Sequence, residues 1–544
     1  MSIDNMKYRL IGFVSALCCV LQLSAVVAKP GLIQARQPDG STVTIKMEGG
    51  PRGHNIYTPD DRLLMTDEKG FYVPADDEFR SRIAQKFTKT KAAKLSLPGL
   101  MSNPFPSKGK QTSLVILVEF PDCKFSIDNP NDFYEEMLNG EDFTQFDATG
   151  SARQYFQENS NGEFDIDFVI YGPVMMPHEM AYYGSNDLWG DDSKPHEMII
   201  DACRILDNDP HNVDFTQYDK NGDDEIDIVY VFYAGYGEAD GGGPNTIWPH
   251  SWEIAGETGI KEYFDGKLLN HYACSNELQA YSPNGDYPDG IGTFCHEFSH
   301  VMGLPDLYST IGGGAFTPGS WTLMDSGSYN NNSRTPPHFS AFERGAFGWL
   351  DPEEIKQPGE YTLPPIGDEN KAYILKTEST NEYFLLENRQ LKDWDTHLPY
   401  HGMLVWHIDY NPIVWNNNTV NVNSAHQYVD IVEADGIPSN WTRDGDVFPG
   451  LYEKEEFSFN TIPSLQSWKG RSLEIDLNNI KEDADGQITF QASLYDPSSG
   501  IANIYHSEDS ESRYFNLQGI EVPNPRKGEL LIEIKGNSAR KVVL

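Results

Sequence analysis

The sequence of 544 residues predicts a multidomain protein: a small β-rich segment, then an α/β domain, then an all-β, sandwich-like domain. Three observations predict this fold class. The length is enough for two or three domains with full cores. Strand-length apolar runs alternate with helical patterns between about 111 and 350, as they do in α/β domains. Beyond 351, short strands separated by Gly, Pro and Asn turns replace that alternation.

The first 28 residues have the pattern of a secretory signal peptide. Lys7 and Arg9 precede an apolar run from Leu10 to Val27, and Val26-Val27-Ala28 is a typical cleavage site. The run is borderline in length for spanning a bilayer, so a membrane anchor is the alternative. No later segment is apolar enough to cross a membrane. We therefore expect an exported protein, secreted or at the cell surface, with no transmembrane segment after signal removal.

Residues 29–110 have the organisation of a propeptide. The alternating run 42–46 follows a turn, and 63–65 and 71–73 are two more short strands. From 86 to 110 the composition is that of an exposed linker, where proteases cut. A permanent N-terminal domain is the alternative. Because no cysteine lies between 29 and 108, latency would depend on an aspartate or on steric blockage rather than on a thiolate.

Strands and helices then alternate up to about residue 234. The apolar run 113–120 predicts a buried strand, and the Asn161-Gly162 turn introduces a half-buried strand. The other predicted elements are helices at 152–156 and 196–206, the second beginning after Pro195, and strands at 164–170 and 226–234.

Residues 293–306 contain an HExxHxxGxxD motif. On a helix, His296 and His300 share a face and can hold one metal ion. Gly303 ends the helix because glycine adopts the left-handed conformation without steric cost, and the chain can then bring Asp306 back as a third ligand. Two imidazoles, one carboxylate and an open position indicate a catalytic zinc site. The alternative is a surface helix with two solvated histidines.

Two further residues of this region have predicted roles. Glu297 lies one step round the helix, where its carboxylate can act on a water at the metal instead of binding the metal. Met324, in the tight turn 321–329, would give the site a soft hydrophobic floor. Cys295 should point away from the ligand face. A helix is also expected from Pro336, ending near Gly348.

A second candidate metal site lies at 219–227. The oxygen side chains of Asp219, Asn221, Asp223 and Asp227 alternate as in a calcium loop. Asp224 replaces the usual glycine, which requires a left-handed conformation that aspartate tolerates. No bidentate glutamate follows at the twelfth position. The alternative is an acidic turn capped by its own side chains.

Charge and cysteine content bound the partners. The chain has 82 acidic and 41 basic residues and a formal net charge of -41, so we expect no nucleic-acid partner. Export leaves Cys123, Cys203, Cys274 and Cys295. Four cysteines allow three disulfide pairings, and buried free thiols fit the sequence equally well.

In the β half, His407, Asp409 and Glu433 could bind a metal, but solvated strand-edge groups are favoured.

The motif from His296 to Tyr308, with Met324 downstream, resembles the immune inhibitor A-like secreted metalloproteases, which look like relatives of the metzincin clan. Segments 155–161, 214–235, 247–250 and 385–395 also look like parts of that family, so the likeness covers about 30–495. The resemblance implies zinc ligation by His296 and His300, a catalytic role for Glu297 and a Met-turn at Met324. Asp306 stands where many metzincins have a third histidine.

The resemblance also implies a propeptide and a secreted proteolytic role. The predicted divisions are 1–28 for the signal peptide, 29–110 for the propeptide, 111–350 for the metzincin-like zinc metalloprotease domain, 351–496 for the β-sandwich-like domain and 497–544 for a tail. That tail is similar to C-terminal segments of exported proteins from Gram-negative bacteria.

We therefore expect a secreted zinc metalloendopeptidase that acts on proteins or peptides as a monomer, with Glu297 as general base. Tyr308 and Tyr329 are candidates for the oxyanion donor, but spacing does not choose between them. Two other classes stay open. One is a surface binding or adhesion module with a proteolytically unused metal site, and the other is a zinc hydrolase of non-peptide bonds.

Overall fold

The computed structural model describes residues 25–50, 53–67, 69–76, 79, 100–101, 105–187, 190–208, 213–279, 287–312 and 316–495. In the C-terminal segment it describes 513–515, 522, 530–535 and 538–543. Most of the predicted signal peptide (1–24) and of the linker (81–99) therefore lies outside the described residues.

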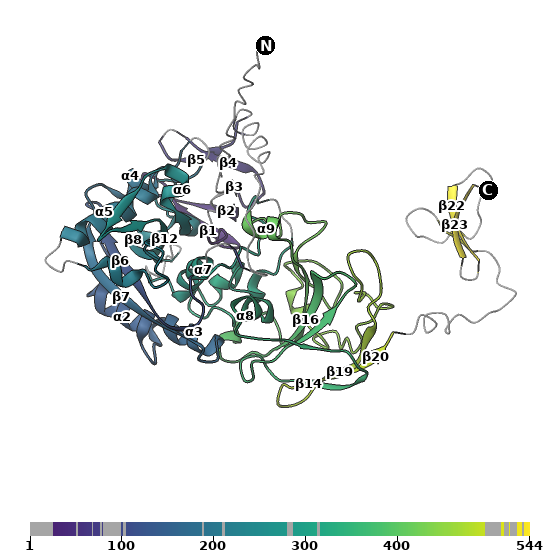
Figure 1. Ribbon diagram of the computed structural model, residues 1–544. Coiled ribbons are helices and arrows are strands. Elements are labelled where there is room, and N and C mark those ends of the chain that lie inside the picture. Colours follow the sequence, from purple (N-terminus) through teal and green to yellow (C-terminus); the bar gives the residue numbers. More distant parts are fainter. Residues whose placement is uncertain are drawn as a thin grey trace, which may run out of the picture.

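The α/β half is built on a five-stranded sheet with the order β7-β6-β8-β12-β9 (Figure 1). The strands are β6 (Gly109–Glu119), β7 (Phe164–Met175), β8 (Val229–Tyr236), β9 (His250–Glu253) and β12 (His271–Leu278). All neighbours are parallel except β9, which runs antiparallel to β12 at the edge. A separate hairpin joins β10 (Glu262–Phe264) to β11 (Lys267–Leu269).

Helices cover both faces of this sheet, which explains the continuous apolar run in β6. Val115 and Leu117 pack into one core with α2, α3 and α7, whereas Leu114 and Ile116 pack into a second core with α4, α5 and α6. A strand buried on both faces must be apolar at successive positions. The helices are α2 (Pro130–Asn139), α3 (Ala152–Asn159), α4 (Met180–Gly184), α5 (Pro195–Asn208), α6 (Ile254–Thr258) and α7 (Ile291–Val301).

The N-terminal segment forms an antiparallel sheet, β1-β2-β3-β4-β5, that lies against the α/β half (Figure 1). Its strands are β1 (Leu32–Arg36), β2 (Thr42–Gly50), β3 (Gly53–Tyr57), β4 (Leu63–Thr66) and β5 (Tyr72–Pro74). The apolar side of this sheet shares one core with Ala239 and Trp248 of the α/β half. The N-terminal sheet therefore buries its apolar face against the rest of the protein.

Three residues of the predicted linker, Leu100, Met101 and Phe105, are buried. The N–H groups of Met101 and Phe105 donate to the carbonyls of Gly303 and Val301 at the end of α7. Phe105 is buried and packs edge to face on Phe298. This segment satisfies carbonyl groups that the end of a helix leaves without an intrahelical donor. Tertiary contacts thus override the linker composition at these three residues.

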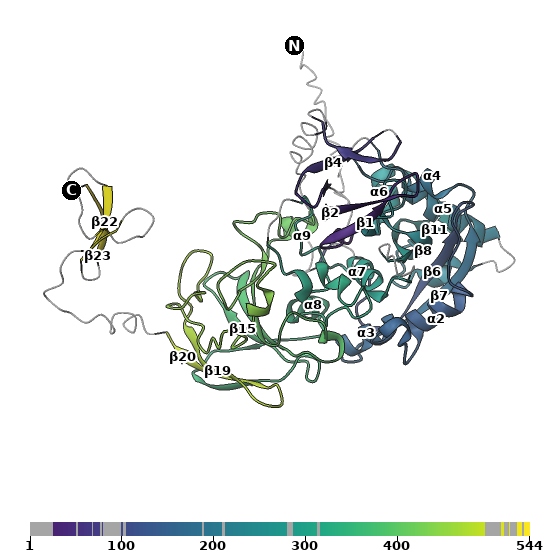
Figure 2. The ribbon, with the colours of Figure 1, turned by 180° about the vertical axis from the view of Figure 1, so that it is seen from behind.

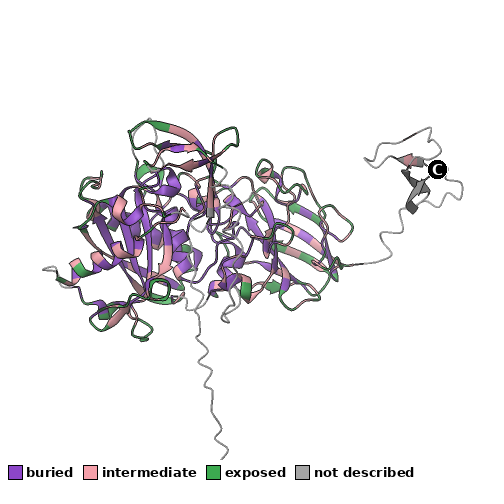
Figure 3. Cartoon of the chain, turned by 90° about the horizontal axis from the view of Figure 1, so that it is seen from above, coloured by how far each residue is buried: buried purple, intermediate pink, exposed green. Residues whose placement is uncertain are grey.

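The β half contains two sheets, β13-β15-β16-β17-β18 and β14-β20-β19 (Figure 2). The strands are β13 (Glu353–Glu354), β14 (Gly359–Leu363), β15 (Tyr373–Lys376), β16 (Glu382–Arg389), β17 (Gly402–Asp409), β18 (Val429–Ile431), β19 (Ile475–Glu482) and β20 (Ile488–Leu494). Side chains from both sheets form a common core, as in a sandwich. The central strands of both halves are buried (Figure 3).

The larger sheet of the β half is covered on both sides. Leu386 and Val405 face the smaller sheet, whereas Leu385 and Trp406 belong to the core that contains α7 and α8. Helix α8 (Ala341–Phe347) begins five residues later than expected, because Ser340 and Glu343 form a capping box there. Helix α9 (Pro412–Asn416) follows β17.

Three further observations concern the C-terminal segment, the cysteines and the lengths of the helices. The C-terminal segment contains a three-stranded sheet of β21 (Arg513–Phe515), β22 (Leu530–Lys535) and β23 (Ser538–Val543). The four cysteines of the described ranges, Cys123, Cys203, Cys274 and Cys295, are free thiols. Among the helices of the described ranges, none has the length and apolar character needed to span a bilayer.

Candidate metal centre

Helix α7 places the two histidines of the motif side by side. The Nε2 atoms of His296 and His300 are 3.0 Å apart, and both rings are buried. Gly303 has a φ of 102°, and its N–H donates to the carbonyl of His300, so the helix ends as the motif predicted. Only glycine adopts this backbone conformation without strain.

The turn after Gly303 brings Asp306 to the histidines. Its Oδ1 atom lies 3.2 Å from Nε2 of His296 and 3.0 Å from Nε2 of His300. A tetrahedral zinc ion with ligands at about 2.0–2.1 Å has ligand atoms about 3.3 Å apart. The three residues therefore form a group that could hold one metal ion, the one such His/Cys/Asp/Glu group found among the residues that the structure describes.

Backbone carbonyls orient both imidazole rings. His296 Nδ1 donates to the carbonyl of Leu323 at 2.7 Å, and His300 Nδ1 donates to the carbonyl of Leu304 at 2.8 Å. With the proton on Nδ1, each ring directs the lone pair of Nε2 toward Asp306. This arrangement is typical of metal-binding histidines.

Asn418, from the loop after α9, holds the aspartate in place. Its Nδ2 donates to Asp306 Oδ2 at 2.5 Å, and its Oδ1 accepts the Asp306 N–H at 2.7 Å. Asn418 is buried and has a φ of 48°, a left-handed conformation that asparagine tolerates. Burial raises the pKa of Asp306, but His300 and His296 outweigh that effect and hold it below its usual range. The site thus presents an ionised carboxylate.

Glu297 lies beside this group and contacts the N-terminal segment. Its Oε1 accepts the backbone N–H of Val26 at 2.7 Å, whereas Oε2 has no hydrogen-bond partner among the described residues. Burial, and then the charge of Asp306, raise the pKa of Glu297 well above its usual value, although the Val26 hydrogen bond opposes them. The carboxylate therefore faces a peptide amide next to the candidate ligands.

Three aromatic side chains hold the same segment. Tyr308 donates from its hydroxyl to the carbonyl of Ala25 at 2.5 Å. Trp248 Nε1 donates to the carbonyl of Val26 at 3.0 Å, and the Tyr329 hydroxyl donates to the carbonyl of Val27 at 2.7 Å. These contacts use backbone atoms, so they do not depend on the sequence of the bound segment.

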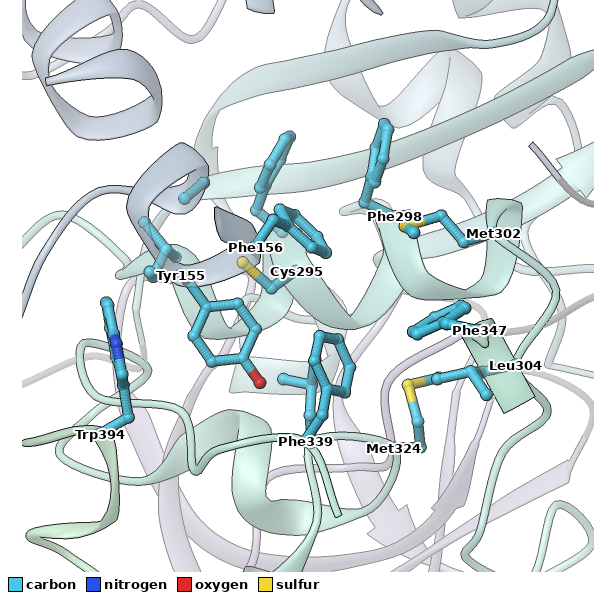
Figure 4. Close-up of a cluster of buried hydrophobic side chains, with 14 of the residues drawn as sticks. Tyr155, Phe156, Cys295, Phe298, Met302, Leu304, Met324, Phe339, Phe347 and Trp394 are labelled. Atoms are coloured by element: carbon cyan, nitrogen blue, oxygen red, sulfur yellow. The ribbon is translucent and has the colours of Figure 1, made fainter. Parts of the chain in front are cut away.

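The turn that carries Met324 lies directly beneath the site. Met324 is buried, and its carbonyl accepts the N–H of Leu307, next to Asp306. In Figure 4 its side chain lies against Leu304. Cys295 points to the opposite side of α7, among Tyr155 and other core residues, as the sequence predicted (Figure 4).

The sequence that contains this site is similar to that of known proteins. Residues 105–349 match the family model described as Immune inhibitor A peptidase M6, catalytic domain. Residues 105–349 are thus similar to the catalytic domains of that family. The match confirms the resemblance predicted from the motif, and it begins and ends close to the predicted limits of the α/β domain.

Curated relatives agree with this match. The chain is 28% identical over 314 residues to "Immune inhibitor A" of Bacillus thuringiensis, covering 49% of this chain and 45% of that protein. It is 26% identical over 321 residues to "Pre-pro-metalloprotease PrtV" of Vibrio cholerae, covering 48% of this chain and 34% of that protein. A third relative, from Arthroderma benhamiae, is named a secreted metallopeptidase (23% over 227 residues). The chain spans less than half the length of the first two relatives.

The predicted calcium loop at 219–227 is closed by an ammonium group. Lys267 Nζ lies 2.7 Å from Asp219 Oδ2 and 2.8 Å from Asp224 Oδ1. Asp224 has the left-handed φ of 67° that the loop required. Asp223 caps the turn through the N–H of Glu225.

The remaining loop oxygens bind backbone amides. Asn221 Oδ1 accepts the N–H of Asp223, and Asp227 Oδ2 accepts the N–H of Lys220 at 2.7 Å. Each of the four candidate side chains thus accepts at least one backbone N–H, and Asp219 also pairs with Lys267. Calcium stays a prediction, and an ion would have to displace the ammonium group.

The polar residues of the β half do not converge on one point. His407 pairs with Glu382 at 2.9 Å, and Asp409 pairs with His426 at 2.9 Å. Glu433 is more than half buried, and burial and the charge of Asp430 raise its pKa to about 8. The ion pairs of His407 and Asp409 explain the positions of these two residues without a metal.

The sequence did not predict roles for Asn418 and Trp248, nor the contacts of residues 25–28 with the candidate metal centre. Asn418 is 112 positions from Asp306, and no local pattern marks it. Trp248 lies in a segment that resembles the family, but spacing did not assign it a role. Residues 25–28 were expected to leave with the signal peptide, so their contacts with the site were not anticipated.

Proposed function

We propose that this chain is an exported zinc-dependent endopeptidase that hydrolyses peptide bonds of proteins. One observation carries the proposal: a peptide unit, Ala25–Val26, lies between the Tyr308 hydroxyl and the Glu297 carboxylate, beside the His296-His300-Asp306 group. A site that accommodates an extended backbone in this way favours peptide substrates over other acyl compounds.

The donor set fits zinc. His296, His300 and Asp306 would hold the ion, the two carbonyl-bound imidazoles supply neutral nitrogen ligands, and Asn418 fixes the carboxylate. Zinc bound by three protein ligands polarises a substrate carbonyl and lowers the pKa of water in its open position. No cysteine takes part, because Cys295 lies on the far side of the helix.

Glu297 has the position of a proton carrier. Its Oε1 contacts the amide nitrogen that would become the leaving amine, and its other oxygen is buried without a hydrogen-bond partner among the described residues. Glu297 would take a proton from the attacking water and then donate it to this nitrogen as the peptide bond breaks. Both transfers need only a small movement of one carboxylate.

Tyr308 has the position of an oxyanion donor. Its hydroxyl donates to the carbonyl of the same peptide unit, the oxygen on which negative charge would develop. Tyr329 donates to a carbonyl two residues farther on, where it would position the substrate. The geometry therefore favours Tyr308 over Tyr329 for this role.

The contacts of residues 25–28 with the candidate site also support the proposal that the unprocessed chain is inactive. Residues 25–29 fill the site, and the sheet β1-β5 anchors them through a shared core with Ala239 and Trp248. The segment would block substrates by occupying their place, a steric mechanism that needs no cysteine. This mechanism requires signal cleavage upstream of Ala25 rather than after Ala28.

The experiment that tests the proposed function uses the secreted protein. We expect about one zinc per chain, cleavage of casein, loss of cleavage with a chelator and recovery when zinc is restored. Cleavage that persists after complete removal of metal would contradict the proposal. Metal binding without cleavage of any protein, combined with hydrolysis of simple esters, would instead favour a zinc hydrolase of non-peptide bonds, and tight ligand binding unaffected by chelation would favour a binding module.

A further inference from the structure

Lys29 of the N-terminal segment enters an acidic pocket beside the site. Its Nζ lies 3.6 Å from Asp240 Oδ1, and the two side chains are only 17% and 3% exposed. The ammonium group also lies 5.9 Å from the centre of the Tyr329 ring. A lysine this well enclosed is recognised by its charge and not only by its backbone.

A second carboxylate, Asp289, borders the same pocket. It is buried just before α7, and the hydroxyls of Thr293 and Ser333 face it without hydrogen-bonding geometry. Burial, and then the charge of Asp240, raise the pKa of Asp289 to about 7, whereas Lys29 opposes this shift. The ion pair with Lys29 therefore belongs to Asp240, and Asp289 adds a second acidic side chain nearby.

The register of the segment fixes where a substrate would meet this pocket. The Ala25–Val26 unit faces Tyr308 and Glu297, with the carbonyl toward the hydroxyl and the N–H toward the carboxylate. Lys29 is the fourth residue after that peptide bond, and its N–H donates to the carbonyl of Ala239 at 3.2 Å.

Departure of the segment would remove the lysine and leave the carboxylates. The other cation near Asp289 is Arg334, whose guanidinium carbon lies 5.8 Å and 5.9 Å from the centres of the Phe146 and Tyr287 rings. A cation beside a buried carboxylate such as Asp240 is favourable. A basic side chain from the substrate supplies that cation.

We propose that Asp240 is the acidic residue of a specificity subsite that takes a lysine or arginine side chain at the fourth residue after the cleaved bond. The inference rests on the proposed function, because it takes the bound segment as a guide to the substrate. It adds a substrate class: basic segments downstream of the cut.

The test uses the processed, zinc-loaded enzyme and peptides that differ only at the fourth residue after the cut, where they carry Lys, Gln or Glu. We expect kcat/KM for the Lys peptide to exceed that for the Gln peptide by about tenfold, with the Glu peptide lower still. Product masses locate the cut. Asp240→Asn should reduce the Lys/Gln ratio to about twofold, whereas Asp142→Asn, an exposed control, should keep it.

Equal kcat/KM for the three peptides, or a full Lys preference in Asp240→Asn, would overturn the subsite while leaving the peptidase in place. A Lys preference at a different distance from the cut would overturn the register. Failure to cleave any of the peptides or casein would instead count against the proposed function.

A second measurement uses the unprocessed full chain and needs no activity. Lys29→Glu should lower the hydrogen-exchange protection of residues 25–36 by about tenfold or more, and Lys29→Arg should retain it. Combining Lys29→Glu with Asp240→Lys should restore part of the protection. Unchanged protection in Lys29→Glu would contradict recognition of the charge.

Discussion

Asp306 is the candidate ligand whose position depends most on distant parts of the chain. The helix brings His296 and His300 together by their spacing alone, but the aspartate lies beyond a turn and needs the two hydrogen bonds of Asn418. Asn418 belongs to the β half, so this half completes the metal centre. Replacing a residue that hydrogen-bonds to a metal ligand typically changes metal affinity without changing the fold.

Replacing Asn418 tests that role. Asn418→Gly keeps the left-handed backbone but removes both hydrogen bonds, so we expect zinc affinity to fall by about 10–100-fold. Competition with a chromogenic chelator measures the affinity. Asn332→Gly is the matched control, because Asn332 is also left-handed but exposed. Equal affinities in the two variants would show that Asn418 does not support the ligand.

Local spacing explains which site residues the sequence could predict. His296, Glu297 and His300 lie within one helical turn or so, and Gly303 marks its end, so their arrangement follows from helix geometry. Tyr308 could be named as an oxyanion donor but not separated from Tyr329, because that choice depends on where a bound peptide lies. Asn418 and Trp248 depend on long-range packing that no short pattern encodes.

At the scale of elements, the N-terminal segment and the site form one unit. Val26 is fully buried between Glu297 and Trp248. Val26→Asp would bury a second carboxylate against Glu297, so we expect the segment to leave and basal hydrolysis by the unprocessed chain to rise about tenfold or more. The assay compares casein cleavage before processing.

Leu32→Asp serves as the control because Leu32 is 61% exposed. N-terminal sequencing of the secreted wild-type chain accompanies the assay. A chain that begins at Lys29, or a Val26→Asp variant with wild-type basal activity, would rule out blockage by residues 25–28.

A buried ion pair joins the β half to the turn below the site. Arg389 of β16 donates two hydrogen bonds to Asp395, at 2.8 Å and 2.6 Å, and others to Glu387 and to the carbonyl of Trp321. Burial raises the pKa of Asp395, but Arg389 outweighs this effect and holds it below its usual value. The pair therefore stabilises the fold above the unfolded-state pKa of about 4, and the contribution is lost as pH falls through the lower folded-state pKa.

Asp395→Asn leaves the Arg389 charge buried with less compensation, so we expect the free energy of unfolding to fall by about 3–5 kcal/mol at pH 7. The difference from wild type should shrink as pH drops below about 4, because the wild-type group becomes protonated. Denaturant unfolding at several pH values measures it. Asp393→Asn, in the same turn but exposed, is the control. A difference that grows toward low pH would contradict the assigned ionisation.

The fold elements were predictable where one pattern decides them. The helix at 196–206 lies within α5, and the strand at 113–120 overlaps β6 and ends one residue beyond it. The start of α8 was wrong because the capping box of Ser340 and Glu343 outweighs the apolar pattern from Pro336. The expectation of an exposed linker was wrong at Leu100, Met101 and Phe105, which neighbouring parts of the chain bury.

At the scale of the whole molecule, the α/β half and the β half are joined by a shared hydrophobic core. Trp406 and Ile408 of β17 and Trp415 of α9 belong to the same buried cluster as Phe294 and Phe298 of α7. The sequence placed a boundary near 350 from the change in strand pattern. Such a pattern shows where the architecture changes, but not that one apolar face of the new sheet belongs to the preceding domain.

Truncated chains test whether the α/β half folds on its own or needs the β half. A chain ending at 350 would expose the apolar face of α7 and α8 and lose Asn418, so we expect it to aggregate or to lack a cooperative unfolding transition. A chain ending at 495 keeps both halves and should bind zinc as the full chain does. Circular dichroism melts and size-exclusion chromatography compare them. A soluble, cooperatively folded chain ending at 350 would show that the α/β half is independent.

The most direct test of the central claim compares Glu297→Gln with wild type. Because Glu297 touches the peptide amide and not the ligand group, we expect the variant to bind about one zinc per chain while hydrolysis of casein falls by about 10²–10⁴-fold. Zinc content and hydrolysis are measured on the same processed samples. A variant that keeps its zinc and still cleaves casein at the wild-type rate would contradict the account.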